Sequence, residues 1–392
     1  MAKSRVKKRP DGRYVMQIYI GMVDGKRKYK SVYGSTPKEV ERKAQEVRIM
    51  LGKGMDVAAM RDTVEEWASR WINMKKLTVS KKHAITCEQK SKVISQYLGK
   101  THITDLRTAE VQSMLIDIAK CGGIGGTPAA RRTLIEYKSI ISQICQMAIE
   151  SRLMDYNPAK AAKIPATKPK ETRRALTSEE QSWIVNTPHR AQTAAMIMMY
   201  AGLRRGELIP LTWSDIDLEK RTIRINKSVE MVGNVPNLKA GAKSIAGNRI
   251  VNIPMALSDY LKSVPKESFL VCPDTKGGIM TESSFRRMWD SYLKDLNLKY
   301  GGFQEGASKY APHGLPMRIP RITPHMLRHT FCTLLYLSGV DVLTARDQMG
   351  HADISTTLAI YTHLDAAHKS KAIDKLDSYI LGDASQMQVK KS

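Results

Sequence analysis

The stretch TPHMLRHTFCTLLYLSGVDVLTARDQMGHADISTTLAIYTH (Thr323–His363) indicates both the fold and the chemistry of the C-terminal part of this chain. It holds three groups that can bind a phosphate oxygen, namely His325, Arg328 and His351, and a tyrosine, Tyr361, ten residues after the last of them. Guanidinium and imidazole groups bind phosphate oxygens, and an activated phenol is a nucleophile. Residues of these types, in this order, can attack a phosphodiester without a metal ion.

The same stretch predicts helices on both sides of a turn. Thr323-Pro324 is a helix-start signal, which places the histidine and arginine that follow in the first turns, where the helix dipole also favours an anion. Gly350 indicates a turn. A short helix that begins around residues 353–355 is expected to carry the tyrosine near its end.

A second segment, AGLRRGEL (Ala201–Leu208), supplies a further arginine. Arginine keeps its charge and its planar fork grips two oxygens, so two arginines from different segments suit the charge that develops on an attacked phosphate. Arg204 is expected to open a helix after the apolar one that ends near Gly202, with Glu207 on the same face to hold its guanidinium. Arg205 is the alternative.

The remaining roles concern protons. Tyrosine has an ordinary pKa of about 10, so neighbouring cations are expected to favour the phenolate, and His325 can bind the phosphate or accept the phenol's proton. A lysine in LKAGAKSIAGNR (Leu238–Arg249) can protonate the leaving 5′ oxygen, with Lys243 and Lys239 as candidates. Each residue alone is more often a packing or surface residue, but the ordered set is hard to obtain by chance.

Composition restricts the partners and the compartment. The 392 residues carry a formal net charge of +25 and a pI of about 9.8, which favours a polyanion, most commonly nucleic acid, over an anionic membrane surface. We find no apolar stretch of eighteen residues and no apolar segment behind the basic start, so a membrane span or signal peptide is not expected. Five cysteines without a CxxC pair indicate reduced, buried thiols.

The opening segment predicts a small three-stranded sheet with one helix. Apolar alternation over residues 14–20 predicts a strand, residues 28–33 a second strand, and Asp24-Gly25 the turn between them. A capping box, in which Thr36 is paired with the glutamate three residues on, predicts a helix over about residues 37–51. A basic sheet of this kind suits a DNA groove, and a solvated basic surface is the alternative.

The rest of the chain predicts mostly helix. Residues 57–165 show helical periodicity for four or five helices, with a break at residues 122–126, and a basic, proline-rich linker follows over residues 163–174. In the C-terminal part, RTIRINKS and NRIVNIP predict strands of a small sheet, and helices resume near Thr281. The expected fold class is α+β, mostly α.

At this point the chain resembles a known family, the tyrosine recombinases of the phage-integrase type. AGLRRGELIPLTWSDID is similar to the family's arginine box, and TPHMLRHTFCTLL and MGHADISTTLAIYTH are similar to its second box. DGRYVMQIYI and KRKYKSVYGSTPKEVERKA resemble the arm-binding domain of mobile-element integrases. The resemblance implies an arm-type DNA-binding domain over residues 1–54, a helical core-binding domain over 57–165 and a mixed α/β-hairpin catalytic domain over 175–392.

The resemblance also implies roles for single residues. Tyr361 is the nucleophile, Glu207 supports Arg204, and the residues that surround the scissile phosphate are Arg204, Lys243, His325, Arg328 and His351. The chain departs from the family pattern in the Ala/Gly-rich loop with two lysines, so Lys239 stays an alternative to Lys243, and in the long lead into the second box over residues 299–321.

The function implied is site-specific recombination, in which a mobile element is integrated or excised through a 3′-phosphotyrosyl intermediate without cofactor or metal. The expected partners are double-stranded DNA at core and arm attachment sites, three further copies of the chain in a tetramer on DNA, an excisionase and a host DNA-bending protein, and no membrane. The expected location is the cytoplasm of a bacterial host, associated with the nucleoid. A type IB topoisomerase and an inactive architectural DNA-binding protein are the alternatives.

Overall fold

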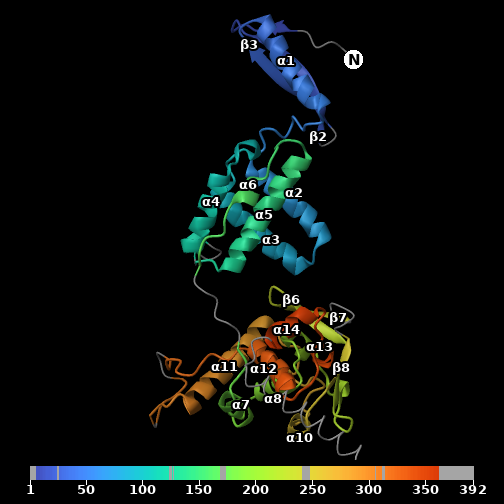
Figure 1. Ribbon diagram of the computed structural model, residues 1–392, viewed down its shortest axis with the longest axis vertical. Helices are drawn as coiled ribbons and strands as arrows, with labels where there is room; N and C mark the ends of the chain where they lie inside the picture. The colour runs from blue at the N-terminus through green and yellow to red at the C-terminus, as the bar shows by residue number, and fades with distance from the viewer. Residues whose placement is uncertain are drawn as a thin grey trace, which may run out of the picture. The chain divides into compact units, whose positions relative to one another are not determined.

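The structure is a computed structural model that describes residues 6–23, 26–122, 126, 128–167, 174–240, 248–304, 306–310 and 314–361, without the side chains of residues 23, 121, 240 and 359–361. The chain divides into two compact units, Met1–Glu171 and Thr172–Ser392 (Figure 1). Each unit is described by itself. Among the described helices, none combines the length and the apolar character that a membrane span needs.

The first unit begins with an antiparallel sheet in the order β1-β2-β3, formed by β1 (Lys7–Lys8), β2 (Tyr14–Val23) and β3 (Lys26–Gly34). Met16 and Ile18 of β2 are buried against α1 (Pro37–Gly52), whereas Tyr19 is exposed on the other face. The predicted alternation and helix are therefore confirmed. The turn residues Asp24-Gly25 lie outside the described residues.

The predicted capping box of α1 is only half correct. The Thr36 hydroxyl accepts a hydrogen bond from the Glu39 backbone N–H, as predicted. The Glu39 carboxylate, however, accepts bonds from the backbone N–H and the hydroxyl of Ser35, at 2.9 and 2.8 Å, and not from Thr36. Ser35 offers this carboxylate two donors, whereas the Thr36 backbone offers one. The carboxylate therefore bonds the residue before the N-cap and not the N-cap itself.

The rest of the first unit is a helical bundle. Its interior is filled by large side chains that include Trp71, Tyr137 and Ile141. The helices, which agree with the four or five that the sequence predicts, are α2 (Val64–Thr78), α3 (Lys81–Leu98), α4 (Thr108–Asp117), α5 (Arg131–Glu150) and α6 (Pro158–Ala161), with a 3₁₀ turn at Ile103–Asp105 and a π turn at Ile118–Gly122. The division of this unit into an arm-type and a core-binding domain stays a prediction.

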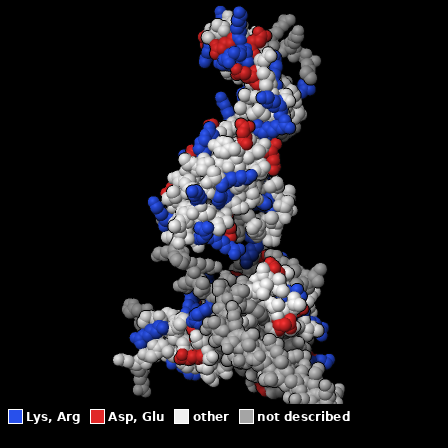
Figure 2. Space-filling model, viewed as in Figure 1, with Lys and Arg blue, Asp and Glu red and all other residues white. Residues whose placement is uncertain are grey.

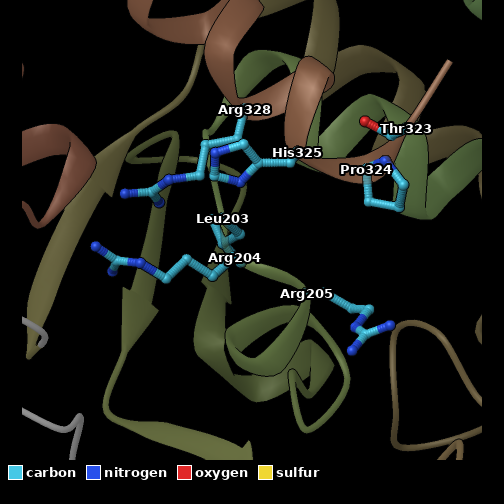
Figure 3. Close-up of a pocket in the computed structure, with 7 residues that line it drawn as sticks. All are labelled: Leu203, Arg204, Arg205, Thr323, Pro324, His325 and Arg328. Atoms are coloured by element: carbon cyan, nitrogen blue, oxygen red, sulfur yellow. The ribbon is translucent and has the colours of Figure 1, made fainter. Parts of the chain in front are cut away.

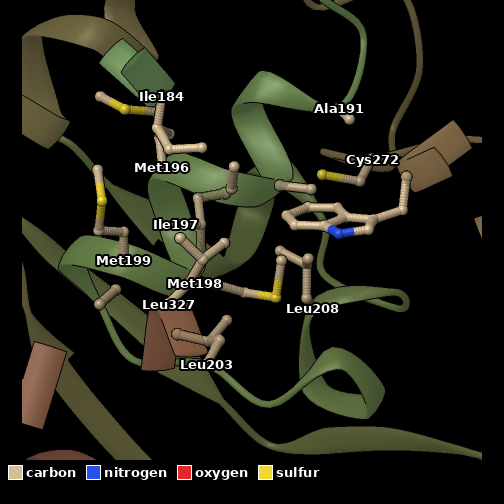
Figure 4. Packing of buried hydrophobic residues seen from close by; sticks show 14 of the residues in the cluster. Ile184, Ala191, Met196, Ile197, Met198, Met199, Leu203, Leu208, Cys272 and Leu327 are labelled. Carbon is tan, nitrogen blue, oxygen red and sulfur yellow. The ribbon is translucent and has the colours of Figure 1, made fainter. Parts of the chain in front are cut away.

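The second unit is built around the apolar helix α8 (Gln192–Tyr200), which lies next to α12 (Pro324–Leu337). Figure 4 shows its side chains packed with residues of distant segments, and those labelled there include Met196, Ile197, Met198, Met199, Leu203, Leu208 and Cys272. The other helices are α7 (Ser178–Val185), α9 (Arg205–Leu208), η3 (Trp213–Asp215), α10 (Met255–Ser263), α11 (Glu282–Tyr300), α13 (Val342–Met349) and α14 (Ile354–Tyr361).

The strands of the second unit form two separate antiparallel sheets. One has the order β4-β5-β8, from β4 (Ile216–Asp217), β5 (Thr222–Ile225) and β8 (Arg249–Asn252), and it contains the two strands that the sequence predicts. The other is a hairpin of β6 (Lys227–Val232) and β7 (Val235–Ala240). The sequence does not predict this hairpin, because its residues after Ser228 were expected to belong to the loop between the two predicted strands.

The elements that hold the candidate residues agree with the prediction. The Thr323 hydroxyl caps α12, with Pro324 at the first helical position. Gly350 ends α13 with a left-handed φ of 62°, and α14 carries the tyrosine at its last residue. The fold class, mostly helical with small antiparallel sheets, is confirmed.

Candidate active site

A buried carboxylate, that of Glu207, is the centre of the candidate site. Its side chain is 5% exposed and accepts hydrogen bonds from the Arg204 guanidinium at 2.7 Å and from both terminal nitrogens of Arg249 at 3.2 and 3.0 Å. The Arg328 guanidinium lies 4.0 Å away. Burial raises the pKa of Glu207, but the bonds and charges of Arg249 and Arg204 outweigh burial and lower it to about 2. One carboxylate therefore offsets part of the charge of three arginines.

Arg328 is held from two sides. Its side chain is 4% exposed, and its terminal nitrogens donate to the backbone carbonyls of Gly202, before α9, and Met349, at the end of α13. Burial, followed by repulsion from the Arg204 charge, lowers its pKa to about 9, so the guanidinium stays charged at neutral pH. Two of its five donors bond these carbonyls and, among the described residues, no other acceptor bonds the guanidinium, which leaves donors for a ligand in the hollow that Arg328 lines.

Arg204 takes part in the same cluster from the other segment. Besides Glu207, it donates to the Gly350 carbonyl at 2.8 Å. Gly350 has to be glycine, since a Cβ on its left-handed backbone would lie 2.6 Å from the Arg249 guanidinium. Arg205, the alternative arginine, instead forms a two-bond pair with Glu282 at 2.7 and 2.8 Å. The structure thus assigns the arginine of the cluster to Arg204.

His351 completes this side of the site. Its Nδ1 lies 2.9 Å from the hydroxyl of Thr357, a side chain that is fully buried in α14. Burial and the charge of Arg328 lower the pKa of His351 to about 4, so the ring is neutral at neutral pH. A neutral ring can offer its other nitrogen to an anion as an N–H donor.

An open hollow of about 390 Å³ is lined by Arg204 and Arg328 of this cluster, together with His325. Figure 3 shows the Arg204 and Arg328 guanidinium groups side by side on one wall, with the His325 ring next to Arg328. His325 is in the first turn of α12, as the sequence predicts. Five of the predicted residues are therefore brought together: Arg204 directly before α9, Glu207 on α9, His325 and Arg328 on α12, and His351 in the turn after α13.

Tyr361, the predicted nucleophile, and Lys243, the predicted proton donor, lie at or beyond the limits of the described residues. Tyr361 is the last residue of α14, one turn after the buried Thr357, and nothing is described of its side chain. Lys243 lies outside the described residues and stays a prediction. Lys239, the alternative, is on β7, and its ammonium is paired with the Glu230 carboxylate across the hairpin.

Sequence reasoning missed two parts of this site. Arg249, at the start of β8, is 6% exposed, bonds both oxygens of Glu207 and donates through Nε to the Gln348 carbonyl at 3.0 Å. Thr357 orients His351. The six-residue spacing between His351, in the turn before α14, and Thr357, on α14, was visible in the sequence, but the spacing of Arg249 from the arginine box was not informative. Within the described part of the chain, no group of His, Cys, Asp and Glu is arranged to hold a metal ion.

Glu207→Gln is expected to destabilise the second unit, because an amide cannot offset the charges of the two buried guanidinium groups, Arg249 and Arg328, and of the half-exposed Arg204. A pKa lowered from 4.5 to about 2 corresponds to roughly 3 kcal/mol at neutral pH. Since the folded pKa is the lower one, this stability is present above pH 4.5 and is lost as the pH falls towards 2. Calorimetry at pH 7 and pH 3 measures both effects. Glu219→Gln, an exposed control, should change neither, and equal melting of the two variants at pH 7 would contradict the expectation.

Comparison with known proteins places this site in a family. The chain matches the model of the phage integrase family over residues 166–368, about half of its length, and that of the phage integrase central domain over residues 64–164. A tyrosine recombinase XerC-like protein of Caldanaerobacter subterraneus is 23% identical over 94% of this chain and 96% of its own. The ICEBs1 integrase of Bacillus subtilis is 22% identical over 74% and 76%.

Solved structures show the same fold. The Tn1549 transposon integrase, in complex with a circular intermediate DNA, matches 80% of this chain and 99% of its own with a TM-score of 0.65 and 19% identity. A lambda integrase dimer bound to a COC′ core site matches 91% and 93% with a TM-score of 0.54 and 18% identity.

The fold and these matches define a site-specific recombinase of the tyrosine type. The chain belongs to the phage integrase family. The predicted family and enzyme class are confirmed, and the two alternatives, a topoisomerase and an inactive architectural protein, are not favoured.

Proposed function

We propose that the protein is the integrase of a mobile element and that it cleaves and rejoins DNA through a covalent bond to Tyr361. The observation that carries the proposal is that Arg204 and Arg328 meet at one buried carboxylate and line one hollow, while α14, which ends in the tyrosine, packs against α12. The named functions of the ICEBs1 and Tn1549 integrases support the mobile element as the source of the substrate.

The charge of the site suits a phosphodiester under attack. Three guanidinium groups and one carboxylate leave an excess of two positive charges, and the transition state of phosphoryl transfer carries about two negative ones. The donors of Arg204 and Arg328 that the protein leaves unused hold the two non-bridging oxygens. The neutral His351 ring adds an N–H donor, and His325 binds an oxygen or receives the phenol's proton. Because carbonyls and a carboxylate fix both arginines beforehand, little reorganisation is needed.

The reaction then proceeds by two exchanges at phosphorus. The Tyr361 oxygen forms a bond to phosphorus, the bond to the 5′ oxygen breaks, and Lys243 donates a proton to that oxygen. A 3′-phosphotyrosyl link and a 5′ hydroxyl result. The 5′ hydroxyl of a partner strand next attacks the link, and the phenol leaves and recovers a proton. The number of phosphodiester-type bonds is conserved, so the residues of the chain suffice and no nucleotide cofactor is required.

The proposed partners follow from charge and from the relatives. A net charge of +25 and the Lys and Arg side chains spread over the visible face of the first unit (Figure 2) support binding of double-stranded DNA at core sites. Exposed Tyr19 of β2 and Tyr29 of β3, next to the exposed Lys and Arg side chains of β3, support separate arm sites. A tetramer on DNA is supported by the lambda integrase tetramer on a Holliday junction. An excisionase, a host DNA-bending protein and a place in the bacterial nucleoid complete the proposal.

The test is to trap and map the covalent intermediate. The full chain is incubated with duplexes that carry the repeats flanking its element and a nick next to the cleavage position, so that the short cleaved fragment diffuses away and the link persists. We expect a denaturant-resistant protein–DNA adduct whose nuclease-trimmed peptide bears the nucleotide on Tyr361. An adduct on another residue would overturn the assignment of the nucleophile, and the absence of any adduct would overturn the enzyme.

A further inference from the structure

The hollow has a second wall that the proposed chemistry does not use. Arg205, Thr323 and Pro324 line it together with the residues of the first wall. Although Arg205 follows Arg204 directly in the chain, Figure 3 shows its side chain pointing away from the Arg204 and Arg328 guanidinium groups. The hollow is therefore bordered by cationic groups at two places, with Arg204 and Arg328 at one and Arg205 at the other.

Arg205 is held in a defined orientation. Its two terminal nitrogens donate to the two carboxylate oxygens of Glu282, the first residue of α11, and its guanidinium carbon lies 5.5 Å from the centre of the Phe285 ring. The side chains of Arg205 and Glu282 are 36% and 37% exposed. The pair occupies one edge of the guanidinium and, among the described residues, no other acceptor bonds it, so three of its five donors remain for a ligand in the hollow.

A contribution to folding stability does not account for the Arg205–Glu282 pair. Ion pairs with this exposure contribute little to folding, and α11 is already anchored by buried side chains that include Phe285, Trp289 and Tyr292. A bare carboxylate at the edge of a phosphate-binding hollow would repel the DNA backbone. Glu282 therefore requires a neutralising partner there, and an arginine with spare donors can neutralise it and bind a phosphate at once.

We propose that Arg205 binds the phosphate next to the scissile one in the cleaved strand, and that Glu282 orients Arg205 and limits its attraction for that phosphate. The inference rests on the proposed DNA substrate. The first wall, with Arg204 and Arg328, holds the phosphate that reacts, and the second wall fixes the register of the strand. In this arrangement Arg205 is a positioning residue with a phosphodiester ligand of its own.

The test replaces single phosphates by neutral methylphosphonates along the cleaved strand and measures the affinity of the full chain for each duplex. For the wild type, we expect weaker binding at the scissile phosphate and, by roughly tenfold, at one adjacent phosphate. In Arg205→Gln, which can still bond Glu282, the loss at the adjacent phosphate should vanish and the loss at the scissile phosphate should remain. The salt dependence of binding should fall by about 0.9 in log–log slope.

Two further variants separate the possible outcomes. Glu282→Gln should bind the unmodified duplex several-fold more tightly, since it removes the carboxylate but leaves the arginine. Arg224→Ala, on an exposed position of β5, is the matched control and should keep the complete wild-type pattern. If Arg205→Gln retains both losses, the phosphate site is wrong while the recombinase stands. If the wild type neither binds these duplexes nor forms an adduct, the proposed function itself fails.

Discussion

Tyr361→Phe is expected to abolish the covalent protein–DNA adduct. The substitution removes the phenol oxygen that is proposed to attack phosphorus and keeps the aromatic ring. Without that oxygen no bond between protein and DNA can form at this residue. The proposed phosphate-binding groups lie directly before α9, on α12 and in the turn after α13, so binding of the uncleaved duplex should stay within about twofold of the wild type. Denaturing gels with the nicked duplex measure the adduct, and a mobility shift measures binding.

A matched tyrosine provides the control for this experiment. Tyr310 is 82% exposed and lies in the segment between α11 and α12, outside the hollow. Tyr310→Phe should therefore form adduct at the wild-type rate. If Tyr361→Phe still forms an adduct, another residue is the nucleophile, whereas loss of both adduct and binding would point to a folding defect and not to chemistry.

Local signals made much of this fold predictable from the sequence. The ends of α7, α12 and α13 are set by contacts within a few residues, namely the Thr177–Glu180 capping box, the Thr323 cap before a proline, and the left-handed Gly350. Such contacts are readable because both partners stand close together in the chain. The same holds for the strand periodicity of β2, where Met16 and Ile18 are buried and Tyr19 is exposed.

Tertiary contacts explain what the sequence did not reveal. The β6–β7 hairpin is stabilised against α9, where a Cβ on Gly206 would meet the Val229 carbonyl at 2.8 Å, so its position depends on a segment twenty residues away. The choice between Arg204 and Arg205 depended on resemblance at first. In the structure it follows from the partners, because Glu207 is fixed by Arg249 from a separate strand. No local pattern contains that third residue.

Arg328→Lys is the substitution that best separates charge from geometry in this site. Lysine keeps the positive charge, but its three donors leave from one nitrogen, so they do not span the carbonyls of Gly202 and Met349 and a phosphate oxygen as the separate nitrogens of the guanidinium do. We expect adduct formation to slow by roughly 10²–10³-fold, the cost of losing one donor aimed at a developing oxyanion. The rate should be measured with saturating duplex, so that weaker binding does not contribute to the loss.

The control and the melting temperature decide how such a loss is interpreted. Arg346→Lys changes an arginine on α13 whose pair with Asp347 is largely exposed, and it should leave the rate unchanged. Arg328→Lys leaves two buried carbonyls short of a donor, which costs about 1–3 kcal/mol each, so some loss of melting temperature is expected. If the variant melts lower but cleaves at the wild-type rate, Arg328 only joins α12 to Gly202 and to the end of α13. If the variant instead forms the adduct more slowly at temperatures below its melting transition, the reaction depends on a guanidinium at the phosphate.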